Sequence, residues 1–99
     1  MFEVTCVLGN RIKLANDRYI HIILKHPELE GMEDEIKNTL IQADFIQRSV
    51  YDSQIFLYYK EFGKDQYFVV VVKVLNKRGF IITSYIADVI KKSEVIWKK

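Results

Sequence analysis

Residues 66–86, QYFVVVVKVLNKRGFIITSYI, decide the fold. Tyr67 to Val74 and Gly79 to Ile86 are almost entirely β-branched or aromatic, and the turn-forming residues Leu75 to Arg78 separate them. Two β-rich runs joined by a short turn predict a hairpin, and we expect Gly79 to take an unusual backbone angle. Because both strands are too apolar to form a solvent-exposed edge of a sheet, the hairpin is expected in the middle of an antiparallel sheet.

The alternation along these strands predicts two different faces. One face is nearly pure hydrocarbon. The other face places polar or aromatic side chains among apolar ones, at Tyr67, Lys73, Thr83 and Tyr85. An antiparallel hairpin brings Lys73 opposite Thr83, so we expect this to be a half-open functional face.

The rest of the chain predicts an α+β domain. The pattern gives a strand over Phe2 to Val7, after which Arg11 to Leu14 either pairs back or leads into the next element. It then gives helices over Asp17 to Lys25 and Met32 to Ile41, strands over Phe45 to Tyr51 and Gln54 to Lys60, a helical turn over Asp88 to Lys92, and an edge strand over Glu94 to Trp97. We therefore expect two N-terminal helices packed on one face of a four-stranded antiparallel sheet, preceded by a short strand or hairpin.

Length and composition narrow the class of protein. The 99 residues predict a single domain, residues 1–99, and 49% hydrophobic with 28% charged residues is ordinary for a folded protein. No apolar run suits a membrane span, and no signal peptide is recognisable at the N-terminus. One cysteine, Cys6, cannot form an internal disulfide, so we expect a cytoplasmic protein in which Cys6 packs in the core. A net charge of +2 permits nucleic-acid binding without arguing for it.

The first predicted helix carries the candidate catalytic bases. Arg18, His21 and Lys25 fall on its polar side, whereas His26 stands before Pro27, where the helix ends. Five helical residues turn through about 140°, so the two histidines are not expected to share a face. The alternative is that His21 is a solvated surface residue and that His26 donates a hydrogen bond to the unpaired backbone carbonyls at the C-terminal end of the helix. We expect no metal site and no cofactor, although a metal-dependent hydrolase using His26 and Glu28 stays a further alternative.

Cations and tyrosines on the predicted sheet are suited to binding the phosphodiester backbone of a nucleic acid. Lysine and arginine match its charge, and tyrosines stack on bases. The candidates for binding substrate are Arg18, Lys25, Tyr58, Lys60 and Tyr67. The alternative is that the tyrosines and Thr83 are simply good strand residues, with Lys73 reaching solvent.

The order and spacing of several segments carry a resemblance to a known group. They are RYIHIILKHPE (Arg18 to Glu28), FIQRS (Phe45 to Ser49), FLYYK (Phe56 to Lys60), YFVVVVKV (Tyr67 to Val74), GFIITSYI (Gly79 to Ile86) and the terminal IWKK. Across most of its length the chain resembles phage-associated members of the barnase, EndoU, colicin and RelE-like (BECR-fold) nuclease superfamily. The resemblance implies helices before a four-stranded antiparallel sheet, and metal-independent RNA cleavage, often by a toxin held by an antitoxin protein. The functional positions that it implies are His21, His26, Arg48, Lys73, Thr83 and Tyr85.

The sequence thus predicts a metal-independent endoribonuclease, a toxin of a toxin–antitoxin or phage-related system. A 2′-hydroxyl would attack the adjacent phosphorus, with His21 or His26 as base. Arg48 and Lys73 would stabilise the charged phosphorane, and Thr83 or Tyr85 would donate a hydrogen bond. RNA and an antitoxin are the expected partners, and the sequence does not indicate an oligomeric state. The alternative is a non-catalytic module that binds RNA or a protein.

Overall fold

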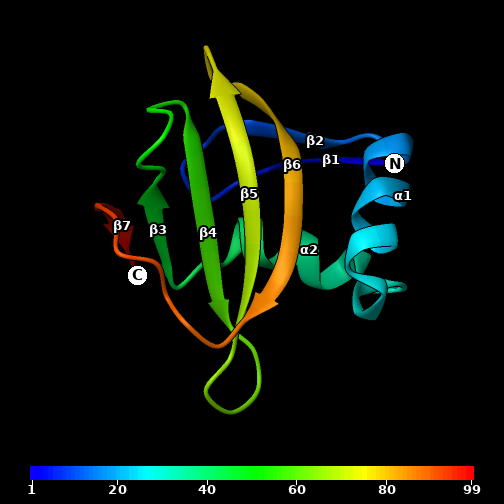
Figure 1. Cartoon of the computed structure of the whole chain (residues 1–99). Coiled ribbons are helices and arrows are strands. Elements are labelled where there is room, and N and C mark those ends of the chain that lie inside the picture. Colours follow the sequence, from blue (N-terminus) through cyan, green and yellow to red (C-terminus); the bar gives the residue numbers. More distant parts are fainter.

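A seven-stranded sheet runs through the protein, in a computed structural model that describes residues 1–99 (Figure 1). Its strands are β1 (Phe2–Thr5), β2 (Arg11–Leu14), β3 (Phe45–Arg48), β4 (Ile55–Glu61), β5 (Tyr67–Leu75), β6 (Arg78–Ala87) and β7 (Val95–Lys98). The helices are α1 (Asn16–Lys25), the short 3₁₀ helix η1 (Pro27–Leu29) and α2 (Glu33–Ile41). The strand order is β1-β2-β6-β5-β4-β3-β7, so the β5–β6 hairpin lies at the centre.

The expected architecture, two helices on a four-stranded antiparallel sheet, was wrong. The sheet has seven strands and is mixed: β2 pairs in parallel with β6, and all other neighbouring strands in the sheet are antiparallel. The β1–β2 hairpin extends one side of the sheet, and β7 pairs with β3 on the other. An unpaired strand edge carries N–H and C=O groups without hydrogen-bond partners. β2 supplies partners for part of the edge of β6, and β7 supplies them for β3.

The β5–β6 hairpin is built on a two-residue turn. Asn76 and Lys77 take the left-handed angles, with φ of 53° and 66°, which suit the twist of a tight hairpin. The prediction for Gly79 was therefore wrong, since its φ is not in that region. Gly79 is needed for space instead: a Cβ there would lie 2.4 Å from the carbonyl oxygen of Lys73.

A bulge in β6 changes which side chains face each other. The register shifts between Val71, which pairs with Thr83, and Val72, which pairs with Ile81, so Ile82 has no partner on β5. The predicted Lys73–Thr83 pairing was wrong for this reason, and Lys73 pairs with Phe80 instead.

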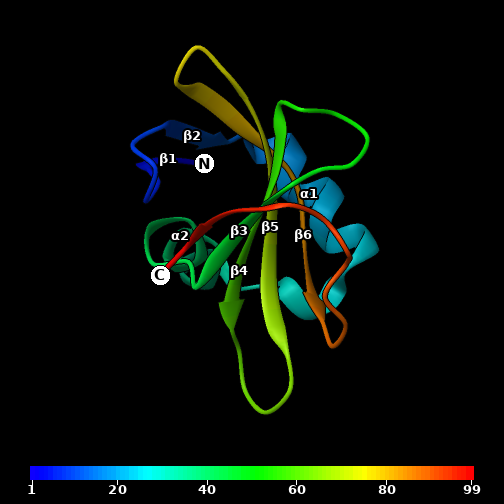
Figure 2. The same ribbon diagram turned by 90° about the vertical axis from the view of Figure 1, so that its left-hand side faces the viewer.

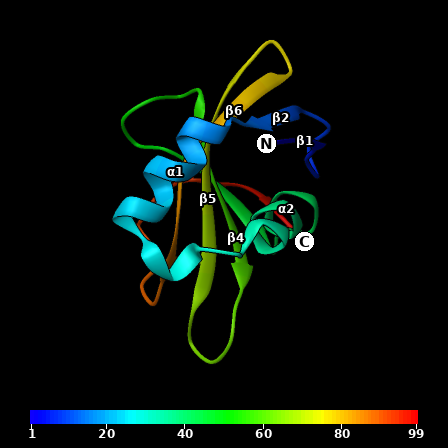
Figure 3. The same cartoon turned by 90° about the vertical axis from the view of Figure 1, so that its right-hand side faces the viewer.

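The two helices occupy different places around the sheet. Figures 1 and 3 show α2 against one face and α1 beside the outer edge of β6. Both helices nevertheless pack into one core, because Tyr19 and Ile22 of α1 are buried in the same cluster as Ile36 of α2. β2 pairs with β6 only as far as Phe80, so the rest of that edge has no neighbouring strand and lies beside α1. No helix in the structure has both the length and the apolar character needed to cross a membrane.

The face away from α2 is partly covered by residues 88–94, which we call the strap (Figures 1 and 2). The strap has no helical turn, contrary to the prediction for Asp88 to Lys92. It is held by β3, where the Gln47 Nε2 group donates to the Lys91 carbonyl at 2.8 Å and the Arg48 N–H donates to the Glu94 carbonyl at 2.9 Å. These bonds to a neighbouring strand replace the internal bonds of a helix.

Candidate functional site

A cleft of about 570 Å³ lies between α1, the outer edge of β6 and the strap. We call it the α1–β6 cleft. Its lining residues are Arg18, His21, Lys25, His26, Ile82, Thr83, Tyr85 and Lys91. The edge of β6 that β2 leaves unpaired supplies one wall, and the bulged Ile82 belongs to that wall.

Both histidines line this one cleft, although they were not expected to share a face of the helix. α1 ends at Lys25, and His26 has φ −131° and ψ 72°, outside the helical region. The residue before a proline is driven out of helical geometry, and Pro27 follows. The His26 ring consequently lies beside Tyr85, with 6.0 Å between ring centroids, instead of continuing the helical rotation from His21.

The carboxylate of Glu28 sits beside His26, with its Oε2 atom 3.8 Å from Nδ1. A carboxylate in this place favours the tautomer that carries the proton on Nδ1, which leaves the Nε2 lone pair free to accept a proton. No third His, Cys, Asp or Glu joins His26 and Glu28 in a group that would hold a metal ion.

The cleft concentrates positive charge. Arg18 and Lys25 extend from α1, Lys91 extends from the strap, and no Asp or Glu is among the lining residues. The Lys91 ammonium lies 5.9 Å from the centre of the Tyr85 ring. A smaller cavity of about 240 Å³, lined by Asp17, Arg18 and His21, adjoins this wall. Three cations in a cleft that no Asp or Glu lines suit a phosphate anion.

Lys91 is the cleft residue that sequence reasoning missed. It belongs to the segment that was predicted as a helical turn, and the sequence contains no signal that brings this segment back to α1. Its position depends on the hydrogen bonds that hold the strap to β3, which is distant in the sequence.

Two cations of the predicted site lie outside the cleft. Arg48 pairs with Glu94 at 3.4 Å and donates to the carbonyl of Ser53 at 3.0 Å. Lys73 pairs with Asp52, with 3.2 Å between Nζ and Oδ2. The structure therefore does not bring Arg48 or Lys73 together with the histidines, and each already has a carboxylate partner.

The remaining predicted binding residues also lie elsewhere. Tyr58 is fully buried and donates to the Cys6 sulfur at 3.0 Å, and burial followed by this bond raises the pKa of Tyr58. The prediction that Tyr58 stacks on a base was wrong because its ring is inaccessible. Lys60 donates to the Gln42 carbonyl at 3.2 Å, and Tyr67 packs among aromatic rings on the sheet face.

The cleft thus offers two imidazoles that can accept or donate a proton, three cations that can hold an anion, and the hydroxyls of Thr83 and Tyr85 as hydrogen-bond donors. No family model, curated protein or solved structure matches this chain, so the chemistry of the α1–β6 cleft rests on the chain's own residues.

Proposed function

We propose that the α1–β6 cleft binds an RNA strand and cleaves it without a metal ion, by attack of a 2′-hydroxyl on the adjacent phosphorus. One observation carries the proposal: two histidines and three cationic side chains line the same cleft, and no Asp or Glu is among its lining residues. A base, an acid and charge stabilisation are what this transesterification requires.

His26 is the proposed base, because Glu28 beside Nδ1 leaves Nε2 free for the proton. His26 takes the 2′-hydroxyl proton as the bond between O2′ and phosphorus forms. His21, in its protonated form, gives a proton to O5′ as the bond between phosphorus and O5′ breaks. The products are a 2′,3′-cyclic phosphate and a 5′-hydroxyl end, so atoms and charge balance without an oxidant or a metal.

Arg18, Lys25 and Lys91 take the role that the sequence suggested for Arg48 and Lys73. Their charges face the cleft, where the phosphorane develops negative charge. The hydroxyls of Thr83 and Tyr85, on the opposite wall, are placed to donate to a phosphate oxygen.

The test is incubation of purified protein with synthetic RNA and with ribosomes in excess chelator, followed by analysis of the RNA ends. We expect 2′,3′-cyclic phosphate ends and a bell-shaped dependence of rate on pH. His21→Ala and His26→Ala should each slow cleavage by about 10²- to 10⁴-fold with the fold retained. A matched oligonucleotide with 2′-O-methyl groups should bind without being cut. Intact RNA in every reaction, or cleavage that leaves 3′-hydroxyl ends, would contradict the mechanism.

In cells we propose that this activity acts as a toxin restrained by an antitoxin protein. Expression of the wild-type chain should arrest growth, and His26→Ala should relieve the arrest at equal protein level. A chain that binds RNA, cuts none and leaves growth unaffected would instead be a non-catalytic binding module.

A further inference from the structure

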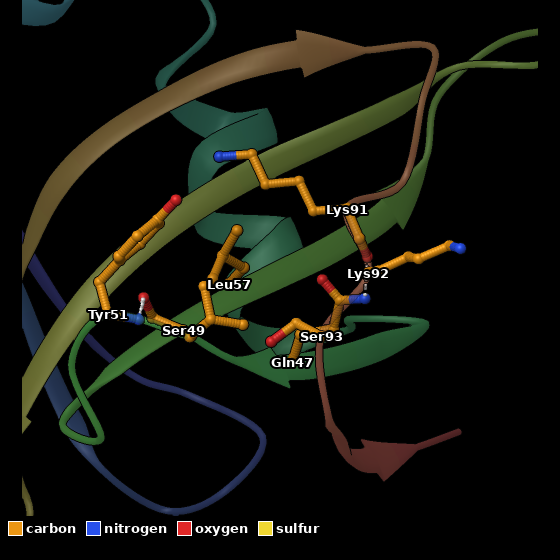
Figure 4. A pocket seen from close by; sticks show the side chains of 8 residues that line it. Gln47, Ser49, Tyr51, Leu57, Lys91, Lys92 and Ser93 are labelled. Carbon is orange, nitrogen blue, oxygen red and sulfur yellow. Dashed lines mark hydrogen bonds between the residues drawn. The ribbon is translucent and has the colours of Figure 1, made fainter.

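A second cavity, of about 50 Å³, lies where β3 and β4 meet the strap (Figure 4). We call it the strap pocket. Gln47 and Leu57 come from the two strands, Ser49 and Tyr51 follow β3, and Lys91 belongs to the strap. The volume admits the edge of a planar ring and is too small for a whole nucleotide.

Gln47 gives this pocket an unpaired hydrogen-bond acceptor. Its side chain is only 3% exposed, and its Oε1 atom finds no donor in the protein. The hydrogen bond from Gln47 Nε2 to the Lys91 carbonyl determines the orientation of the side-chain amide. If the amide were flipped, Oε1 would face the carbonyl oxygen of Lys91, and the two acceptors would repel each other. Figure 4 shows Oε1 turned away from that bond, toward the space between Leu57 and Lys91. Buried acceptors are rarely left unpaired, and a small shift of the side chains that shield Oε1 from solvent would let an N–H group of a ligand reach it.

The other walls suit a flat heterocycle. Leu57, 5% exposed, supplies an apolar surface, and Tyr51 presents a ring that is 95% exposed. The Ser49 hydroxyl accepts from the Tyr51 N–H at 3.1 Å, which leaves its own proton available to donate. An acceptor, a donor and an exposed aromatic ring are the groups that proteins use to hold unstacked bases.

Lys91 joins the strap pocket to the α1–β6 cleft, since it lines both. We propose that the strap pocket takes the edge of a nucleobase next to the scissile phosphate, with Gln47 Oε1 accepting a hydrogen bond from the base. The inference rests on the proposed ribonuclease function and adds a base-recognition subsite to it. A nucleic acid fits better than a protein side chain because Lys91 and Lys92 flank the pocket with two positive charges and no acid lines it.

The experiment measures binding of fluorescent 2′-O-methyl oligonucleotides by anisotropy, with one abasic position moved along the strand. These probes have no free 2′-hydroxyl, so the wild-type protein binds them without cutting. We expect removal of one particular base to weaken binding about tenfold, while removal of bases elsewhere matters little. Gln47→Met and Tyr51→Ala should bind the complete oligonucleotide about tenfold more weakly than the wild type. Removal of that particular base should not weaken their binding any further.

Leu75→Ala is the control, because Leu75 is 48% exposed at the tip of the β5–β6 hairpin and lines neither cavity. It should behave like the wild type. Gln47→Met also removes a strap hydrogen bond, whereas Tyr51→Ala leaves the core intact, so the two variants separate base recognition from strap placement.

RNA binding that depends on no single base, or that is unchanged in both variants, would contradict the proposed subsite. The pocket would then be filled by water or by a protein side chain. Cleavage can persist in that case, so the proposed function survives. A wild-type protein that binds no oligonucleotide overturns both proposals.

Discussion

At the scale of single residues, the cations on the strands are held by neighbouring acids. Lys73 meets Asp52, a carboxylate whose Oδ1 also accepts the Gln54 N–H at 2.8 Å. The Gln54 N–H, followed by the Lys73 ammonium, holds the pKa of Asp52 below its usual value. A lysine among valines is thus explained by a local ion pair, without a bound phosphate.

We expect Lys73→Met to lower the melting temperature slightly and to leave RNA cleavage within about twofold of the wild type. Lys64→Met is the matched control, since Lys64 is exposed and makes no ion pair. Thermal unfolding and a cleavage assay measure both effects. A large loss of cleavage at unchanged stability would return Lys73 to the functional site.

The depressed pKa of Asp52 adds a pH dependence to this pair. A carboxyl whose pKa is lowered on folding contributes stability above its unfolded value, near pH 3.9, and loses it as the pH falls through the folded value. The difference in melting temperature between wild type and Asp52→Asn should therefore be present at pH 7 and shrink below about pH 4. An equal difference at both pH values would show that the charge of Asp52 is irrelevant.

At the scale of elements, the end of α1 places the proposed base. Pro27 stops the helix and keeps His26 outside helical geometry, which directs its ring toward Tyr85. The short helix η1 then begins at Pro27 itself, where a missing N–H costs nothing. Pro27, which is not among the lining residues, thereby helps to bring two histidines into one cleft.

We expect Pro27→Ala to lower kcat/KM for RNA cleavage by at least about tenfold, because His26 becomes free to continue the helix and leave its position. Stability should fall by about 0.4–1 kcal/mol through the more flexible unfolded chain. Circular dichroism and denaturant unfolding separate this loss from misfolding. Full activity in a folded Pro27→Ala protein would show that the proline does not set the position of His26.

At the scale of the whole molecule, the positive charge is gathered where the sheet is incomplete. β2 stops short along β6, α1 fills the open edge, and the strap crosses to the same place from the other side of the sheet (Figure 1). The net charge of +2 hides this concentration, because acids elsewhere offset the three cleft cations. Binding of a polyanion at this cleft should therefore depend on salt more strongly than the net charge suggests.

We expect the logarithm of the RNA-binding constant to fall with the logarithm of salt concentration with a slope of about −2, if three phosphates are neutralised. Arg18→Gln, Lys25→Gln and Lys91→Gln should each make the slope shallower by about 0.7, whereas Lys64→Gln should not. Anisotropy titrations with a 2′-O-methyl oligonucleotide measure these slopes. Equal slopes for all the variants would place the bound strand outside the α1–β6 cleft.

The sequence by itself determined the local elements. β-branched and aromatic runs on either side of a short turn predicted the β5–β6 hairpin, and Pro27 predicted the end of α1. The edge strand near the C-terminus was also predicted and is present, and the N-terminal hairpin is one of the two arrangements that the sequence left open. These features depend on backbone preferences and on the neighbouring residues in the chain, which the sequence shows directly.

Only the tertiary structure decided the parallel β2–β6 pairing, the bulge at Ile82 and the course of the strap. Each joins segments distant in the sequence, and each is selected by packing and by hydrogen bonds between them, which no local pattern encodes. The same reason separates the predicted site residues. His21 and His26 meet in one cleft with Lys91, while Arg48 and Lys73 are drawn to Glu94 and Asp52, because the nearest partner in space determines what a charged side chain does.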